Sequence, residues 1–324
     1  MAGLTIWCNA TLGEPALKLL RDEVVPHRLV FSDAPAVSVL DVGKPDPSLA
    51  AADVAFGQPD PDSLLQAQRI RWVHLTSAGF TRYDRDDLRL ALRRRGGYLT
   101  NSSHVFDEPC AQHALAMILA LERQLPKALV NQRGDRAWPI AELRAGSRLL
   151  NGQTILLLSF GAIAKRLTQL LALFHVRLIA VRRKPDPFPD VEVVGVGELD
   201  RVLPLADHVI NILPENRETV GCINAARFAL MTRGAYFYNI GRGPTIDQDA
   251  LIASLKTGHL GAAFLDVMVP EPLPPEHPLW TTPNCFITPH TAGGHADEEI
   301  RLVRHFLANL QAYTRREPLV NRVF

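Results

Sequence analysis

Short apolar runs alternate with helix-like segments along almost all of this 324-residue chain. In the first hundred residues the apolar runs predict five short strands, at 5–8, 28–31, 53–56, 72–75 and 98–100. Helical patterns separate several of these strands, at 15–23, 61–69 and 86–95. Strands that alternate with helices at this spacing form βαβ units, so the pattern predicts a parallel sheet covered by helices.

A second alternating region begins at Thr154 and predicts six more strands, at 154–158, 177–181, 208–213, 235–240, 262–266 and 285–288. Six strands with interleaved helices are typical of a complete doubly wound nucleotide-binding domain. One strongly apolar helix is expected before this region, at 108–123. Another is expected after it, at 297–316, with Val303, Leu307 and Leu310 on its apolar face.

The composition narrows the class of protein. Basic and acidic residues number 35 and 34, which gives a formal net charge of +1, and 47% of the residues are apolar. This balance gives no reason to expect a nucleic acid or a membrane surface as partner, and it argues against general disorder. No apolar stretch approaches the ~20 residues that span a bilayer, and no basic leader precedes the first apolar run. We therefore expect a cytoplasmic protein.

The four cysteines, Cys8, Cys110, Cys222 and Cys285, lie far apart in the sequence. None forms a CxxC pair. The spacing therefore predicts neither a zinc site nor the disulfide framework of a small secreted domain, and it is typical of a reducing compartment. No metal is expected.

A strand, a turn, a helix and a second strand follow one another over 154–181, which is the context of a Rossmann fingerprint. The turn and first helical residues read SFGAIA, where GxGxxG or GxGxxA is the usual pattern. Gly161 allows the backbone to approach a pyrophosphate, and Ala164 is small enough for close packing of the helix on the strand. Ser159 departs from the pattern because it places a Cβ at the tight turn. Taken alone, the motif also fits an ordinary βα turn.

The end of the second strand in this unit is basic. NAD-binding sites place an Asp or Glu about 20 residues beyond the fingerprint, where it accepts hydrogen bonds from the ribose 2′-hydroxyl. Here the chain reads Val181-Arg182-Arg183-Lys184, with no carboxylate before Asp186. Guanidinium groups bind phosphate by charge-assisted bonds, so the pattern favours NADP(H), with NAD(H) still possible. A solvated basic loop is the alternative interpretation.

Three polar residues follow the last three predicted strands of this region. Arg242 stands in the turn after the strand at 235–240, and Glu271 stands in a proline-rich loop after the strand at 262–266. His290 follows the strand at 285–288. Because open parallel sheets bind ligands at the carboxyl ends of their strands, the three side chains are expected at one site.

Several motifs occur together and in order between about Asn101 and Gly294. They are Ala111-Gln112-His113, Leu213-Pro214 with Thr219, NIGRG at 239–243, LDVMVPEPL at 265–273 and PHTAGG at 289–294. In this combination the chain closely resembles the D-isomer-specific 2-hydroxyacid dehydrogenase family, and within it the glyoxylate/hydroxypyruvate reductase branch. The first hundred residues match mainly in pattern, best at LTSAG over 75–79.

The resemblance implies reduction of a small 2-keto acid to the D-2-hydroxy acid. Arg242 would bind the substrate carboxylate through a two-donor fork and help to polarise the C2 carbonyl. His290 would donate the proton, and Glu271 would fix the tautomer of that ring and keep it protonated for the reduction. Backbone amides of Ala78 and Gly79 would also hold the substrate carboxylate.

The resemblance also implies a set of cofactor contacts, with Asp266 on the nicotinamide carboxamide. The expected cofactor-binding residues are Gly161, Ala162, Ile163, Arg182, Arg183, Leu213, Pro214, Thr219, Ile240, Gly241 and Asp266. A dinucleotide-sensing, corepressor-like protein with little turnover is the alternative function. Ser159 favours this alternative, whereas the intact set of Arg242, Glu271 and His290 argues against it.

The expected architecture is an α/β fold of two doubly wound domains. A Rossmann NAD(P)-binding domain at 103–292 would be inserted into a flavodoxin-like substrate domain formed by 1–102 and 293–324. Segments 101–104 and 293–295 would then act as hinges. The stretch 123–148, which contains Trp138, matches the arm with which members of the family form a two-fold homodimer.

Overall fold

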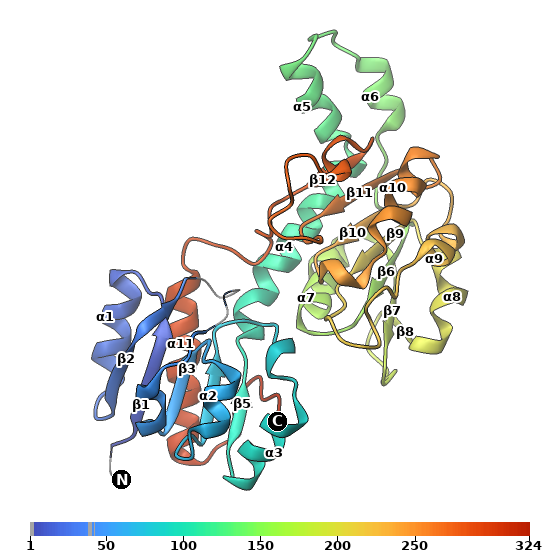
Figure 1. The fold of residues 1–324 in the computed structure, drawn as a ribbon. Coiled ribbons are helices and arrows are strands. Elements are labelled where there is room, and N and C mark those ends of the chain that lie inside the picture. Colours follow the sequence, from blue (N-terminus) through green and yellow to red (C-terminus); the bar gives the residue numbers. More distant parts are fainter. Residues whose placement is uncertain (1–2, 38–40, 42) are drawn as a thin grey trace. The chain divides into compact units, whose positions relative to one another are not determined.

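The computed structural model describes residues 3–37, 41 and 43–324, and the chain divides into two compact units (Figure 1). Unit 1 comprises Met1–Phe106 and His295–Phe324, and unit 2 comprises Asp107–Gly294. The sequence placed the crossings at 102/103 and 292/293. In the structure the first crossing falls within one continuous helix, α4 (Ser103–Glu122), and the second follows Gly294.

Unit 1 is built on a five-stranded parallel sheet with the order β2-β1-β3-β4-β5. This is the flavodoxin-like order, in which the chain reverses direction between β1 and β3. The strands are β1 (Thr5–Ala10), β2 (Arg28–Ala36), β3 (Val54–Gly57), β4 (Trp72–Leu75) and β5 (Tyr98–Thr100). The helices are α1 (Glu14–Glu23), α2 (Pro61–Gln66), α3 (Asp86–Arg94) and α11 (Glu298–Arg315).

Alternation along the strands of unit 1 supplies apolar side chains to both faces of the sheet. On one face, Ile6, Phe56 and Trp72 pack against α1 and α11, and Val303, Leu307 and Leu310 are buried there as the sequence predicted. The opposite face packs against α2, α3 and the C-terminal Phe324. The C-terminal helix and tail are therefore part of the core of unit 1, although unit 2 separates them from it in sequence.

Unit 2 is built on a seven-stranded parallel sheet with the order β12-β11-β10-β9-β6-β7-β8. This is the Rossmann order, extended by one strand, with its switch point between β6 and β9. The strands are β6 (Thr154–Leu158), β7 (Arg177–Arg182), β8 (Glu192–Gly195), β9 (His208–Asn211), β10 (Tyr236–Asn239), β11 (Ala262–Leu265) and β12 (Cys285–Ile287).

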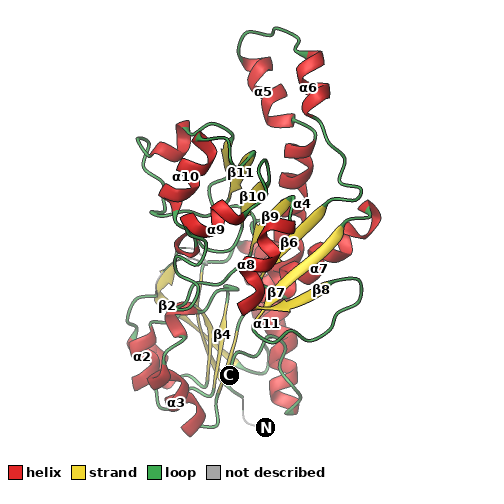
Figure 2. Ribbon diagram, turned by 90° about the vertical axis from the view of Figure 1, so that its right-hand side faces the viewer, coloured by secondary structure: helices red, strands yellow, loops and turns green. Residues whose placement is uncertain are grey.

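Helices cover both faces of the unit 2 sheet (Figure 2). Leu156 and Leu158 of β6 pack into one apolar cluster with α8 (Leu199–Val202), α9 (Ala225–Leu230) and α10 (Gln248–Lys256). Ile155 and Leu157, which alternate with them, are fully buried on the face covered by α4 and α7 (Ala162–Leu171). The continuous apolar run of β6 thus reflects burial on both sides.

Several elements differ from the sequence-based expectation, and β2 continues to Ala36 where the sequence predicted an end at residue 31. The seventh strand, β8, was not predicted, because it has only four residues, lies at the sheet edge and is only partly buried. Helix α4 begins at Ser103 rather than at residue 108. Pro109 favours a helix start, since it has no N–H to donate. Buried Val105 and Phe106 extend the apolar surface of the helix by another turn, and their packing outweighs the missing hydrogen bond.

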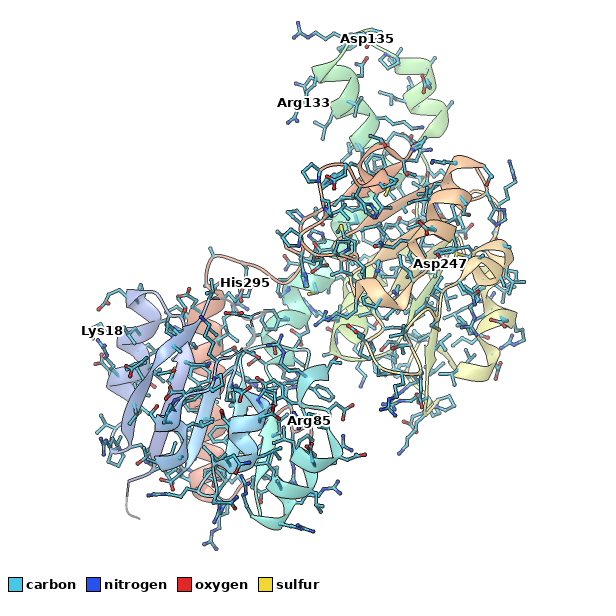
Figure 3. All side chains as sticks on the ribbon, in the orientation of Figure 1. Lys18, Arg85, Arg133, Asp135, Asp247 and His295 are labelled. Atoms are coloured by element: carbon cyan, nitrogen blue, oxygen red, sulfur yellow. The ribbon has the colours of Figure 1, made fainter. Side chains whose placement is uncertain are left out.

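A helical hairpin extends from unit 2 between α4 and β6. It consists of α5 (Leu125–Arg133) and α6 (Ile140–Gly146), and neither helix has a buried residue. Figure 3 shows Arg133 and Asp135 at its tip, away from the sheet. Among the described residues, no helix combines the length and the apolar character needed to span a bilayer.

Candidate active site

Arg242, Glu271 and His290 leave the same edge of the unit 2 sheet. β10, β11 and β12 are parallel neighbours, and each of the three side chains follows the carboxyl end of one of these strands. Parallel pairing brings these ends together although the residues are up to 48 positions apart in sequence. The topology therefore collects the three predicted catalytic residues on one side of one compact unit.

His290 and Glu271 form a hydrogen-bonded pair. Nδ1 of His290 lies 2.7 Å from Oε2 of Glu271, and Oε1 of Glu271 accepts the backbone N–H of Met268 at 2.9 Å. Partial burial raises the pKa of Glu271, but the bonds from His290 and Met268 and the charge of Arg242 outweigh it and hold that pKa below its ordinary value. A charged Glu271 fixes the ring through Nδ1, so Nε2 is the nitrogen available for proton transfer.

The backbone turn that carries Arg242 is held by buried amide side chains. Nδ2 of Asn239 donates to the carbonyl of Arg242 at 3.3 Å, and Oγ1 of Thr245 donates to the same carbonyl at 2.6 Å. Nδ2 of Asn211, at the end of β9, donates to Oδ1 of Asn239 at 3.0 Å and to Oγ1 of Thr245 at 2.7 Å. This network fixes the direction in which Arg242 leaves the sheet.

Glycines on both sides of Arg242 allow close backbone packing. A Cβ at Gly241 would lie 2.7 Å from the carbonyl oxygen of Leu213, and a Cβ at Gly243 would overlap the backbone of Met268. Neither neighbour is a flexible side-chain end, so neither position accepts a larger residue without a backbone shift. The glycines beside Arg242 are therefore explained by close backbone contacts, and Gly243 contacts the segment that leads to Glu271.

Asp266 anchors the loop that carries His290. Its side chain is almost completely buried, and its Oδ1 accepts the hydroxyl of Thr288 at 2.7 Å and the N–H of Thr291 at 2.8 Å. Its Oδ2 accepts the N–H of Ala292 at 3.0 Å. The carboxylate thus binds this loop on both sides of His290. A contact between Asp266 and the nicotinamide carboxamide stays a prediction.

The turn after β6 has the form of a dinucleotide-binding loop. Ser159, at the first fingerprint position, has φ of +87°, a conformation that glycine adopts readily and serine rarely. Gly161 caps the ten-residue helix α7, and a Cβ added there would meet no atom within 4 Å. The protein itself therefore leaves open space in front of a helix N-terminus, where a pyrophosphate binds favourably. Ala162 and Ile163 form the first turn of that helix, and these residues fit the proposed cofactor.

The end of β7 carries positive charge. Arg182 is the last residue of this strand, and its Nη1 lies 3.6 Å from Oδ2 of Asp186. Arg183 and Lys184 are exposed beside it. The structure thus puts guanidinium groups, rather than a carboxylate, at the position that usually contacts the ribose.

The loop after β9 is folded on itself near the Arg242 turn. Oγ1 of Thr219 donates to the carbonyl of Pro214 at 2.6 Å, and the N–H of Leu213 reaches Oδ1 of Asn211 at 3.2 Å. Ile240 is buried, and its N–H donates to the Asn211 carbonyl at 3.1 Å. The predicted cofactor residues of this loop therefore lie at the carboxyl ends of β9 and β10.

In unit 1, the loop with Ala78 and Gly79 follows the carboxyl end of β4. Oγ of Ser77 donates to the carbonyl of Gly79 at 2.6 Å, and Nδ2 of Asn101 donates to the carbonyl of Ala78 at 2.7 Å. These bonds use the carbonyls of the loop and fix its conformation. That its amides hold a substrate carboxylate stays a prediction.

Comparisons with known proteins agree with this geometry. Residues 115–292 match the model of the D-isomer specific 2-hydroxyacid dehydrogenase, NAD binding domain. The chain is similar to glyoxylate reductases from Thermofilum pendens, with 30% identity over 81% of this chain and 78% of that protein, and from Aeropyrum pernix, with 32% identity over 81% and 80%. It is also similar to the solved D-isomer specific 2-hydroxyacid dehydrogenase of Xanthobacter autotrophicus Py2 in complex with NADPH and MES. That likeness has a TM-score of 0.82, with 25% identity over 100% of this chain and 98% of that one.

The chain belongs to the D-isomer-specific 2-hydroxyacid dehydrogenase family. It is therefore an NAD(P)-dependent oxidoreductase that acts on 2-hydroxy acids. The family and the fold class that the sequence motifs implied are confirmed.

Sequence reasoning missed three amide side chains that hydrogen-bond to the loops of the candidate site. Gln58, directly after β3, donates through Nε2 to Oγ1 of Thr76 and Oγ of Ser77, both at 3.0 Å. Asn211 braces the Arg242 turn, as described above. A buried apolar strand that ends in an amide was the signal for both. The third, Gln248, lies at the exposed start of a helix and gives no such signal.

Proposed function

We propose that this dehydrogenase reduces a small 2-keto acid, of the glyoxylate and hydroxypyruvate kind, to the D-2-hydroxy acid with NADPH. The observation that carries the proposal is the His290–Glu271 pair at 2.7 Å, close enough to Arg242 for its charge to lower the pKa of Glu271. Such a group of residues joins a proton donor to a carboxylate-binding cation. The glyoxylate reductases among its relatives support a small substrate.

Each of these residues has a separate role in the proposed reaction. Arg242 binds the substrate carboxylate through its guanidinium fork and stabilises the charge that develops on the C2 oxygen. His290 gives the proton on Nε2 to that oxygen, and Glu271 stabilises the ring in the required orientation. In unit 1, we propose that the backbone amides of Ala78 and Gly79 also bind a substrate carboxylate, as the family resemblance implies. When bound, the reduced nicotinamide supplies the hydride to C2.

The reaction is tested with purified protein, NADPH and a panel of 2-keto acids that contains glyoxylate, hydroxypyruvate, pyruvate and bulkier analogues. We expect turnover with the small members and a loss of about 10²–10⁴-fold in kcat for His290→Ala, because a positioned acid is removed. His175→Asn is the matched control, since asparagine tolerates the φ of +51° found there.

Two results count against this function. Full activity of His290→Ala with the best substrate excludes His290 as the proton donor. NADPH binding without turnover on any member of the panel favours the alternative, a dinucleotide-sensing protein. The strained turn at Ser159 is the observation that supports this alternative.

The preference for NADPH rests on Arg182 and Arg183. A charge-assisted hydrogen bond to phosphate contributes about 1.5–3 kcal/mol, so we expect Arg183→Ala to raise KM for NADPH by roughly 10–100-fold and to leave KM for NADH nearly unchanged. Arg177→Ala, at the opposite end of β7, is the control and leaves both values unchanged. A wild-type KM for NADH below that for NADPH contradicts the preference.

A further inference from the structure

The loop that carries Glu271 has little apolar packing of its own. Val269, Pro270, Glu271 and Pro272 are all exposed, and Val269 is 42% exposed although it is large and apolar. On either side of this exposed stretch, Met268 is buried and Leu273 packs against the apolar cluster of unit 2. Since burial does not fix this part of the loop, polar contacts must determine where the Glu271 carboxylate lies.

The side chain of Gln248 makes two such contacts, one with the carbonyl and one with the N–H of Val269. Nε2 of Gln248 donates to the carbonyl of Val269 at 2.6 Å, and the N–H of Val269 donates to Oε1 of Gln248 at 2.8 Å. The side-chain amide thus pairs with Val269 as the backbone of a neighbouring strand would. Two bonds to one residue fix the orientation of the loop as well as its distance from α10.

Gln248 belongs to the same chain segment as Arg242. It is the first residue of α10, after Asp247, whose Oδ1 accepts the N–H of Ala250 at 3.0 Å and fixes the helix start. Gly243 packs against the backbone of Met268, and the N–H of Met268 donates to Glu271. The segment 242–248 therefore holds the Glu271 loop at Met268 and again at Val269.

We propose that Gln248 is a positioning residue that sets the Glu271 carboxylate against His290 and Arg242. In this assignment Gln248 does not contact the reacting atoms. The assignment rests on the proposed function. Gln248 acts through Glu271, because the loop it holds begins two residues before that carboxylate.

The chemistry of the contact requires an amide. Glutamate at this position accepts the N–H of Val269, but its second oxygen faces the Val269 carbonyl without a proton to donate. Its charge also adds to those of Asp247 and Asp249 on either side. Methionine keeps the length and shape of the side chain and makes neither bond, whereas asparagine is one methylene too short.

The test compares Gln248→Met and Gln248→Glu with Lys256→Ala, a control at the exposed far end of α10. Loss of two neutral hydrogen bonds predicts a fall in kcat for 2-keto acid reduction of roughly 5–50-fold in Gln248→Met, with KM for NADPH changed less than about 2-fold. The alkaline limb of the kcat–pH profile moves to lower pH, since Glu271 supports the protonated ring less well. Equal kcat and equal pH profile in Gln248→Met and wild type overturn the proposal.

A double-mutant cycle shows whether Gln248 acts through Glu271. In the Glu271→Gln background, Gln248→Met is expected to lower kcat no further, whereas an independent role gives multiplied losses and overturns the proposal.

An NMR spectrum of the His290 ring gives a readout that needs no turnover. In Gln248→Met the resonance of the Nδ1 proton that His290 shares with Glu271 is expected to move upfield as that hydrogen bond weakens, and an unchanged resonance overturns the proposal. A wild-type protein without turnover removes the proposed function, while this spectrum still decides the role of Gln248. If Gln248→Met does not fold, Gln248→Glu is used for the same three measurements, with the same expected direction.

Discussion

Ser159 occupies a backbone conformation that suits glycine better than serine. With φ of +87°, its Cβ crowds the following carbonyl, a strain of about 1–2 kcal/mol for an L-residue. The residue stands at the first fingerprint position, where the sequence pattern expected glycine. The fold therefore keeps the glycine-type turn although the sequence has replaced the glycine.

Replacement of Ser159 by glycine is expected to stabilise the protein by about 0.5–1 kcal/mol. Relief of the strain exceeds the entropy cost of glycine in the unfolded chain, which is roughly 0.5–1 kcal/mol. Urea denaturation measures the change. Ser159→Ala is the control, because it keeps the Cβ and removes only the hydroxyl. A glycine variant less stable than the alanine variant would show that the turn is not strained.

Individual site residues were predictable from the sequence where a side chain of suitable chemistry directly follows a predicted strand. Arg242, Glu271 and His290 follow three neighbouring strands, and a parallel sheet brings the ends of such strands together. The contacts of Gln58 and Gln248 were not predictable in the same way, although the place of Gln58 directly after a buried strand was itself a signal. Both act by bonding to residues far away in the sequence, and an isolated glutamine carries no sign of which atoms it meets.

Among the elements of unit 2, β9 carries a buried titratable side chain. Nδ1 of His208 lies 3.0 Å from the hydroxyl of Tyr238, and Nε2 lies 2.7 Å from Oε1 of Gln153. Burial, together with the charge of Arg148, lowers the pKa of His208 to about 3. Glu122 is 3.5 Å away, but its charge is taken up by Arg148 and does not outweigh the burial. His208 is therefore neutral in the folded protein.

This burial makes the protein sensitive to acid. The unfolded chain binds a proton at His208 near pH 6.5, whereas the folded chain does so only near pH 3. The contribution of His208 to stability is complete above about pH 6.5 and falls by about 1.4 kcal/mol per pH unit below it. We expect His208→Gln to remove this slope in urea denaturation measured between about pH 6.5 and 4.5. His175→Asn serves as control. If the free energy of unfolding depends on pH equally in wild type and in His208→Gln, the expectation is wrong.

Element positions were predicted most reliably where the apolar pattern is strong. β6 and α11 match their expected positions within about a residue, because each has a long run of buried side chains. β8 was missed because a four-residue edge strand with a single buried residue is too short to show a pattern of burial. The start of α4 was missed because a proline signal conflicts with the packing that decides it.

At the scale of the whole molecule, the α5–α6 hairpin exposes apolar surface. The exposed apolar side chains of this region are Leu125, Leu129, Val130, Trp138 and Ile140, with Trp138 81% exposed. A soluble monomer rarely leaves so many large apolar residues uncovered on one projection. The homodimer that the family resemblance implied is therefore the expected state in solution, with this hairpin at the interface.

A charged substitution on the hairpin tests the dimer. We expect the double variant Leu129→Glu and Val130→Glu to convert a dimer into a monomer, since two carboxylates cannot be buried in an apolar contact. Sedimentation equilibrium measures the mass. Lys256→Glu, which changes charge outside the hairpin, keeps the wild-type mass. A monomeric wild type, or a double variant that remains dimeric, excludes this interface.

The double crossing between the units came from motif order and family resemblance, and periodicity alone does not show it. The boundary lies inside α4, where one helix continues from one core to the next. Neither a loop nor a change of composition marks this first crossing, whereas the second lies in the loop after Gly294. The sequence therefore predicts the number of sheets more securely than the residue at which the chain passes between units.

The open space at Gly161 shows that folding and ligand binding have different requirements at this position. A Cβ there has no atom within 4 Å apart from its chain neighbours, and the φ of −92° suits any residue. The fold therefore accepts a residue larger than glycine at position 161. Only a ligand that occupies this space requires glycine there. If the cofactor binds at Gly161 as proposed, a single substitution there is expected to leave the fold intact and to abolish dinucleotide binding.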